Sequence, residues 1–121
     1  MMGAIVLYEP DDLMCHLLRE WLTGAGYTVY GAAAVDPNIR IGLVIASIST
    51  TGVDRDTLIS RLQREHPEAS MLALCSQARS GLSSDGALAR WLGVDRVMAK
   101  PLRRGEFLAT VASLIGPSPS H

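Results

Sequence analysis

The sequence predicts an α/β protein built on a doubly wound sheet of five parallel strands. Short apolar runs alternate along the chain with segments in which apolar residues recur every three or four positions, as they do in strands and amphipathic helices. The runs Ala4-Ile5-Val6-Leu7-Tyr8 and Gly42-Leu43-Val44-Ile45-Ala46 are apolar throughout, which is typical of parallel strands that helices cover on both faces. With right-handed crossovers, the expected strand order is 2-1-3-4-5.

Five short segments rich in apolar residues mark the expected strands, at residues 4–8, 27–30, 42–48, 70–75 and 94–99. The periodic segments between and after them predict helices at residues 12–23, 54–65, 84–92 and 106–115. The first helix is expected to bury one wide apolar face and to have Asp11 or Asp12 as its N-cap. That face is formed by Leu13, Met14, Leu17, Leu18, Trp21 and Leu22. Strand–helix alternation of this kind is flavodoxin-like.

One connection is too short for the regular pattern. Only the segment Gly31–Gly42 separates the second strand from the third, and Pro37 interrupts it. A parallel crossover with a helix takes at least about a dozen residues. We therefore expect the second helix to be shortened or missing, and one face of the second and third strands to be left uncovered.

Length and composition indicate one domain, residues 1–116, followed by a flexible C-terminal tail, residues 117–121. A net charge of −1 and a sequence pI near 6.3 argue against nucleic-acid binding. No apolar run is long enough to span a bilayer, so we expect no membrane association. The chain has two cysteines, in unlike settings, which favours a reduced, cytoplasmic protein.

The end of the third strand lacks an acidic residue. In an open parallel sheet, ligands and chemistry gather beyond the carboxyl ends of the central strands. Here the third strand ends in Ser47, Ile48 and Ser49, followed by Thr50 and Thr51. This edge of the sheet therefore offers hydroxyl groups from the third strand and no carboxylate.

Three stretches of the sequence resemble the receiver domain of bacterial response regulators. The resemblance extends from about Ala4 to Ile115. The stretches are Ile5-Val6-Leu7-Tyr8-Glu9-Pro10-Asp11, then Leu18-Arg19-Glu20-Trp21-Leu22 with Gly24-Ala25-Gly26-Tyr27, and Gly93-Val94-Asp95-Arg96-Val97-Met98-Ala99-Lys100-Pro101-Leu102. The resemblance implies an acidic pair after the first strand that holds Mg²⁺. It also implies an acceptor Asp ending the third strand, a Thr or Ser ending the fourth, and a Lys after the fifth.

This chain keeps few of the residues that the resemblance implies. The acidic pair falls on Glu9 and Pro10, with Asp11 one residue late, and the acceptor position falls on Ser47. The Thr or Ser position falls on Cys75, with Ser76 beside it, and the Lys is present as Lys100. A neutral serine without a general base is a weak nucleophile, and Glu9 alone would bind Mg²⁺ poorly. We therefore interpret the chain as a pseudo-receiver with no cofactor, no metal site and no catalytic residue.

Lys100 has a structural alternative to a catalytic role. We expect it to form a salt bridge with Glu9 across the strand ends, in the space that a metal would occupy. Cys75 is expected to be an inert buried thiol. The resemblance also implies that Pro101 follows a cis peptide bond.

The C-terminal third is the basic side of the chain and is the candidate docking surface. Trp and Arg are enriched at interaction hot spots, which favours partner binding by Arg90, Trp91, Arg96, Arg103 and Arg104. We expect a receiver-like module of a two-component or phosphorelay pathway that acts by protein–protein contact. Its partner would be a histidine kinase, a regulator or an output protein, or a second copy of the chain in a homodimer.

Two alternatives remain open. The first is a phosphate-accepting receiver whose acceptor has moved to a nearby residue such as Asp54 or Asp11. The second is a small flavodoxin-like enzyme that uses Cys75 or Ser47 as its nucleophile.

Overall fold

The computed structural model describes residues 4–31, 38–48, 55–75 and 93–115, with side chains from residue 58 in the third segment. Within these ranges lie the strands β1 (Ala4–Tyr8), β2 (Thr28–Gly31), β3 (Leu43–Ile48), β4 (Ser70–Cys75) and β5 (Arg96–Ala99). The helices are α1 (Asp12–Gly24), α2 (Arg55–Glu65) and α4 (Arg104–Ile115). The predicted helix at residues 84–92 and the predicted tail at 117–121 lie outside the described residues.

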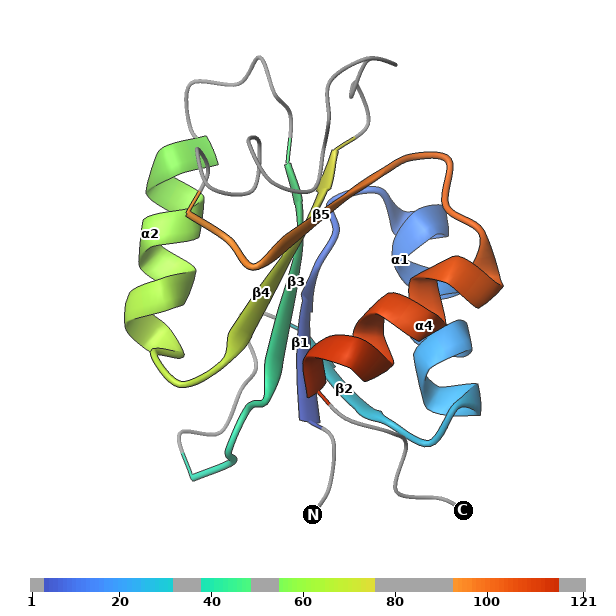
Figure 1. The fold of residues 1–121 in the computed structure, drawn as a ribbon, viewed down its shortest axis with the longest axis horizontal. Helices are drawn as coiled ribbons and strands as arrows, with labels where there is room; N and C mark the ends of the chain where they lie inside the picture. The colour runs from blue at the N-terminus through green and yellow to red at the C-terminus, as the bar shows by residue number, and fades with distance from the viewer. Residues whose placement is uncertain (1–3, 32–37, 49–54, 76–92, 116–121) are drawn as a thin grey trace.

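The five strands form one parallel sheet in the order β2-β1-β3-β4-β5, which confirms the predicted fold class and strand order. Helix α2 lies on one side of the sheet, and α1 and α4 lie on the other, so the described residues form three layers (Figure 1). Strand β3 is central and all six of its residues are buried. Burial on both faces explains why every residue of β3 except Ser47 is apolar.

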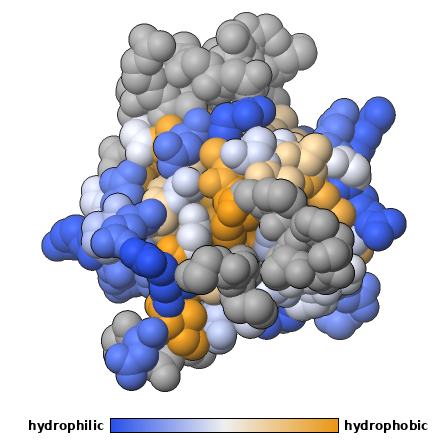
Figure 2. All heavy atoms as spheres, turned by 60° about the horizontal axis from the view of Figure 1, so that its bottom comes forward, coloured by the Kyte–Doolittle hydropathy of each residue, from blue (hydrophilic) through white to orange (hydrophobic). Residues whose placement is uncertain are grey.

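Two apolar clusters hold the layers together, one on each face of the sheet. The cluster under α2 includes Val6, Val44 and Leu62, and the cluster under α1 and α4 includes Ile45, Leu18 and Phe107. Trp21 of α1 packs at the edge of the second cluster, its ring centroid 5.9 Å from that of Phe107. The end of the molecule at which the strands begin carries hydrophobic residues among polar ones (Figure 2).

The link between β2 and β3 is described only for residues 38–42, which form no helix; the remainder, residues 32–37, lies outside the described residues. The expectation that one face of the third strand is left uncovered is wrong, because all residues of β3 are buried. Ile41 is buried and Ile39 packs against the cluster under α2. The short link itself therefore supplies apolar cover that a full helix would otherwise provide.

Helix α1 buries a narrower face than the sequence predicts. Leu18 and Leu22 are fully buried, whereas Leu13 is 83% exposed and Leu17 is 38% exposed. A helix of 3.6 residues per turn that packs on a sheet buries only the stripe facing it, and Leu13 and Leu17 lie on the flank of that stripe. Asp11 is the N-cap residue, as predicted, but its side chain forms no capping hydrogen bond.

Two other boundaries differ from the prediction. Strand β5 begins at Arg96 and not at residue 94, because the Asp95 carboxylate accepts the backbone N–H of Met71 at 2.7 Å. The Met71 N–H is thus paired with the Asp95 side chain and not with a backbone carbonyl of a longer β5. Helix α4 begins at Arg104, two residues early, and the Phe107 N–H donates to the Arg103 carbonyl in a helical bond of 2.8 Å. Among the described residues, no helix has the length and apolar character needed to cross a bilayer.

Candidate functional site

Three polar side chains meet at the carboxyl ends of the central strands. Glu9 follows β1, Ser47 lies near the end of β3, and Lys100 follows β5. Strands β1 and β3 pair in a register that ends with Tyr8 opposite Ala46, so Glu9 and Ser47 are neighbours across the ladder. We call Glu9, Ser47 and Lys100 the strand-end cluster.

Glu9 is the centre of the strand-end cluster, and protein groups hydrogen-bond both of its carboxylate oxygens. Oε1 accepts from Lys100 Nζ at 2.8 Å and from the Ser47 hydroxyl. Oε2 accepts the backbone N–H of Asp11 at 3.1 Å. The salt bridge expected between Glu9 and Lys100 is therefore confirmed. The bond from Ser47 to Glu9 was not predicted, although the adjacency of the first and third strands in the predicted order could have suggested it.

The cluster is largely closed to solvent. The Glu9 side chain is 2% exposed, the Lys100 side chain is 19% exposed, and Ser47 is 7% exposed. Burial would raise the pKa of Glu9, but the hydrogen bonds from Lys100, Ser47 and Asp11 and the charge of Lys100 outweigh it. The pKa of Glu9 is consequently lowered from its ordinary value of 4.5. Glu9 is thus an ionised carboxylate that is held by donors on both oxygens.

The remaining predicted positions lie around this cluster. Pro10 and Asp11 are exposed, and Asp11 reaches Glu9 through its backbone N–H. Cys75 ends β4 and is fully buried, as expected, with its carbonyl accepting the Lys100 N–H at 3.0 Å. Ser76 lies outside the described residues. The peptide bond between Lys100 and Pro101 is cis, as the resemblance implies.

The cluster does not fit the Mg²⁺ that this fold family implies. Mg²⁺ requires several oxygen ligands in near-octahedral geometry. Glu9 is the one acidic side chain of the cluster, and both of its oxygens already accept hydrogen bonds. Within the described ranges, no group of three or more His, Cys, Asp or Glu side chains is arranged to hold a metal ion.

The structure describes three of the five predicted partner-binding residues. Arg103 and Arg104 are exposed at the start of α4. Arg96 is only half-exposed and lines a cavity between β5 and α4, which the sequence did not indicate. Arg90 and Trp91 lie outside the described residues, so the structure leaves their role as a prediction.

No family model matches the sequence, and no curated protein matches it. The chain is similar in structure to a response regulator from Thermotoga maritima, with a TM-score of 0.74, 18% identity, and coverage of 95% of this chain and 98% of the other. For a receiver domain protein (CheY-like) from Methanospirillum hungatei JF-1, the TM-score is 0.72, the identity 17% and the coverage 93% of both chains. For an adenylate cyclase from Rhodopirellula baltica, the TM-score is 0.75, the identity 16%, and the coverage 95% and 88%.

These likenesses identify the fold. The chain has the fold of a response regulator receiver domain, and the resemblance seen in its sequence is confirmed at that level. In this chain Ser47 lies near the end of β3, at the position where the resemblance implies an acceptor aspartate.

Proposed function

We propose that this chain is a receiver-like signalling module of a two-component or phosphorelay pathway that acts by docking to a signalling protein, without phosphorylation of an aspartate. One observation carries the proposal. Ser47 lies at the carboxyl end of the central strand and donates to Glu9, whose charge Lys100 neutralises. A serine hydroxyl acts as a nucleophile when a base can take its proton, and phosphoryl transfer needs cations directed at the phosphoryl oxygens. Here the carboxylate that accepts from Ser47 is Glu9, whose lowered pKa makes it a weak base, and Lys100 is directed at Glu9.

The same arrangement supports the absence of a resident Mg²⁺ and of catalytic activity. Lys100 already supplies the positive charge beside Glu9, at 2.8 Å. The buried Cys75 thiol has no exposed surface from which to attack a substrate. From the composition of the chain and its receiver fold, we infer that the protein is soluble and cytoplasmic.

The chemical part of the proposal is tested by incubating the protein with acetyl phosphate and Mg²⁺ and measuring its intact mass. We expect no phosphoryl adduct, while a receiver domain with an acceptor aspartate is phosphorylated in the same reaction. An adduct on this chain would overturn the proposal. Mapping it to Asp11 or Asp54 would establish a relocated acceptor, and mapping it to Ser47 would establish a serine acceptor.

The docking part is tested on the exposed arginines of α4. A variant carrying Arg103→Glu and Arg104→Glu should lose binding to the histidine kinases or output proteins that the wild-type chain binds. The matched control carries Arg61→Glu and Arg64→Glu, which reverse the same number of exposed charges on α2, across the sheet. Equal binding by both variants would remove the start of α4 from the docking surface.

A further inference from the structure

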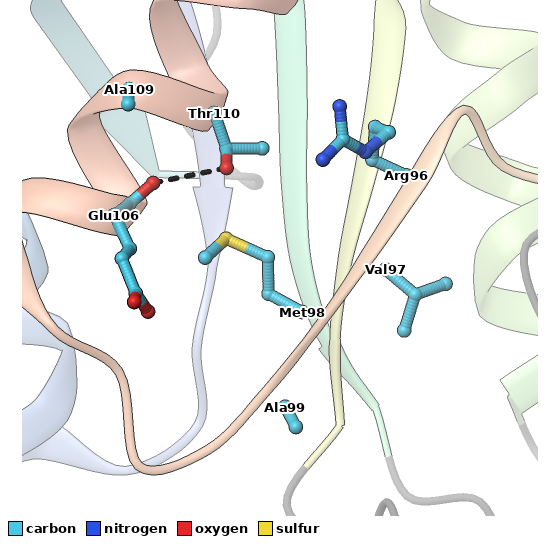
Figure 3. Close-up of a pocket in the computed structure, with 7 residues that line it drawn as sticks. All are labelled: Arg96, Val97, Met98, Ala99, Glu106, Ala109 and Thr110. Carbon is cyan, nitrogen blue, oxygen red and sulfur yellow. Dashed lines mark hydrogen bonds between the residues drawn. The ribbon is translucent and has the colours of Figure 1, made fainter. Parts of the chain in front are cut away.

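A cavity of about 490 Å³ lies between strand β5 and helix α4. Its lining residues come from both elements, and they are Arg96, Val97, Met98, Ala99, Glu106, Ala109 and Thr110 (Figure 3). Sites for small molecules typically have volumes of about 300–1,000 Å³. The cavity runs along β5, the last strand of the sheet, and its lining includes none of the strand-end cluster.

Arg96 brings an unused hydrogen-bond donor to this cavity. Its Nε is buried and has no hydrogen-bond partner, which in the described part of the chain is true of no other buried side-chain nitrogen or oxygen. Buried polar groups are nearly always hydrogen-bonded, because an unpaired donor loses its water without compensation. The guanidinium group presents its donors in a planar fork that matches a carboxylate. A carboxylate would therefore suit the guanidinium group at this corner.

The other walls suggest what the carboxylate is attached to. Met98 extends from β5 toward α4 between Arg96 and Glu106, while Val97 points to the opposite side of the strand (Figure 3). Ala109 is small and leaves room on the helix wall. Thr110 does not compete for the ligand, because its hydroxyl donates to the Glu106 carbonyl at 3.0 Å. The middle of the cavity is thus apolar.

Glu106 limits the charge that the cavity can accept. Its carboxylate lies on the far side of Met98 from the Arg96 guanidinium, and the two form no ion pair (Figure 3). A second negative charge on a ligand would be repelled from that end. We propose that this cavity binds a small organic monocarboxylate, whose carboxylate is held by Arg96 and whose apolar part lies on Met98. This binding site is additional to the proposed docking function and does not depend on it.

The probe for this site is hexanoate, added to the isotope-labelled protein and followed by the shifts of backbone amide resonances. We expect saturable shifts at residues 96–99 and 106–110, and no such shifts with hexylamine, which has the same chain and the opposite charge. No saturable shift, or shifts confined to other residues, would overturn the proposal.

Four variants sharpen the experiment. Arg96→Met should raise the dissociation constant for hexanoate by roughly tenfold or more, because it removes the charged donor. Ala109→Leu, at an exposed helix position, should also abolish binding by filling the cavity while leaving Arg96 intact. Glu106→Gln should lower the dissociation constant about two- to fivefold by removing the repulsive charge. Arg104→Met is the matched control, since Arg104 is exposed on α4 and does not line the cavity.

The variants also decide between the cavity and non-specific attraction to positive charge. If Arg104→Met weakens hexanoate binding as much as Arg96→Met, the shifts report the general charge of the surface and the proposal is wrong. If Arg96→Met fails to fold, Ala109→Leu and Glu106→Gln still give opposite expected changes. Equal affinities in those two variants would likewise contradict a site in this cavity.

Discussion

The charged side chains at the two ends of strand β5 differ in whether the protein provides them with a partner. At the carboxyl end, Lys100 donates to Glu9 within a cluster in which the Glu9 side chain is 2% exposed. At the other end, Arg96 has a buried Nε without a partner, and Glu106 lines the same cavity without pairing with it. The closed end has its charges satisfied by the protein itself, which suits a structural role. The open end has one buried donor without a partner, the Arg96 Nε, which suits the proposed binding.

The largest expected effect is at the closed end. Lys100→Met leaves the Glu9 carboxylate buried without its charged partner, and breaking a buried ion pair in this way costs about 3–5 kcal/mol. Urea unfolding at neutral pH measures the loss. The control is Arg40→Met, which breaks an ion pair with Glu68 in which both side chains are 75% exposed. Such pairs contribute about 0–1 kcal/mol, so equal losses in the two variants would show that the strand-end cluster is not closed.

The Ser47 hydroxyl should contribute less than the charge of Lys100. Ser47→Ala removes a donor to a buried carboxylate, and we expect the free energy of unfolding to fall by about 1.5–3 kcal/mol. Ser113→Ala is the comparison, because Ser113 is exposed and its hydroxyl donates only to the Thr110 carbonyl. That variant should stay within about 0.5 kcal/mol of the wild type. If Ser47→Ala leaves the free energy of unfolding unchanged, the hydroxyl does not stabilise the Glu9 carboxylate.

The pH dependence of stability should identify Glu9. Its pKa is lowered in the folded protein, so its ionisation stabilises the fold above the ordinary value of 4.5. This stabilisation is lost as the pH falls through the lowered pKa. Urea unfolding at a series of pH values from neutral to below 4.5 should show the loss in the wild type and a flatter profile in Glu9→Gln. A profile unchanged by Glu9→Gln would exclude Glu9 as the source.

The smallest effect is expected at the open end. Arg96→Met replaces a side chain whose buried Nε is unpaired, so the protein gives up no hydrogen bond from that atom. We expect no loss in the free energy of unfolding, and a gain of up to about 1 kcal/mol because the variant removes a buried unpaired donor, measured by the same urea titration. A loss comparable to that of Lys100→Met would contradict the contrast between the two ends of β5.

The sequence predicts the sheet well because its signals are local. The apolar residues at 4–8 and at 71–75 are uninterrupted and are followed by the polar residues Glu9 and Ser76, and β1 and β4 end where these runs end. The face of α1 is predicted less well, since six apolar residues recur at helical spacing but the sheet covers only a stripe. The pattern cannot show that Leu13 and Leu17 fall outside that stripe.

The candidate site was likewise predicted in one part and not in another. The pairing of Glu9 with Lys100 was predicted because the resemblance places both residues at one site; the strand order alone does not give it, since β3 and β4 lie between β1 and β5. The cavity at Arg96 has no sequence signal. It depends on the separation between β5 and α4 and on the direction of one side chain, and both are set by tertiary packing. Arg96 was therefore predicted as part of a docking surface and not as the wall of a cavity.

The most direct test of the strand-end cluster is a carbon-13 NMR titration of the Glu9 carboxyl group in the wild type and in Lys100→Met. The account predicts a Glu9 pKa below 4.5 in the wild type, unchanged by Mg²⁺, and a higher pKa in the variant, where burial is no longer opposed by the lysine. A wild-type pKa at or above 4.5, or a resonance that shifts saturably with Mg²⁺, would contradict it.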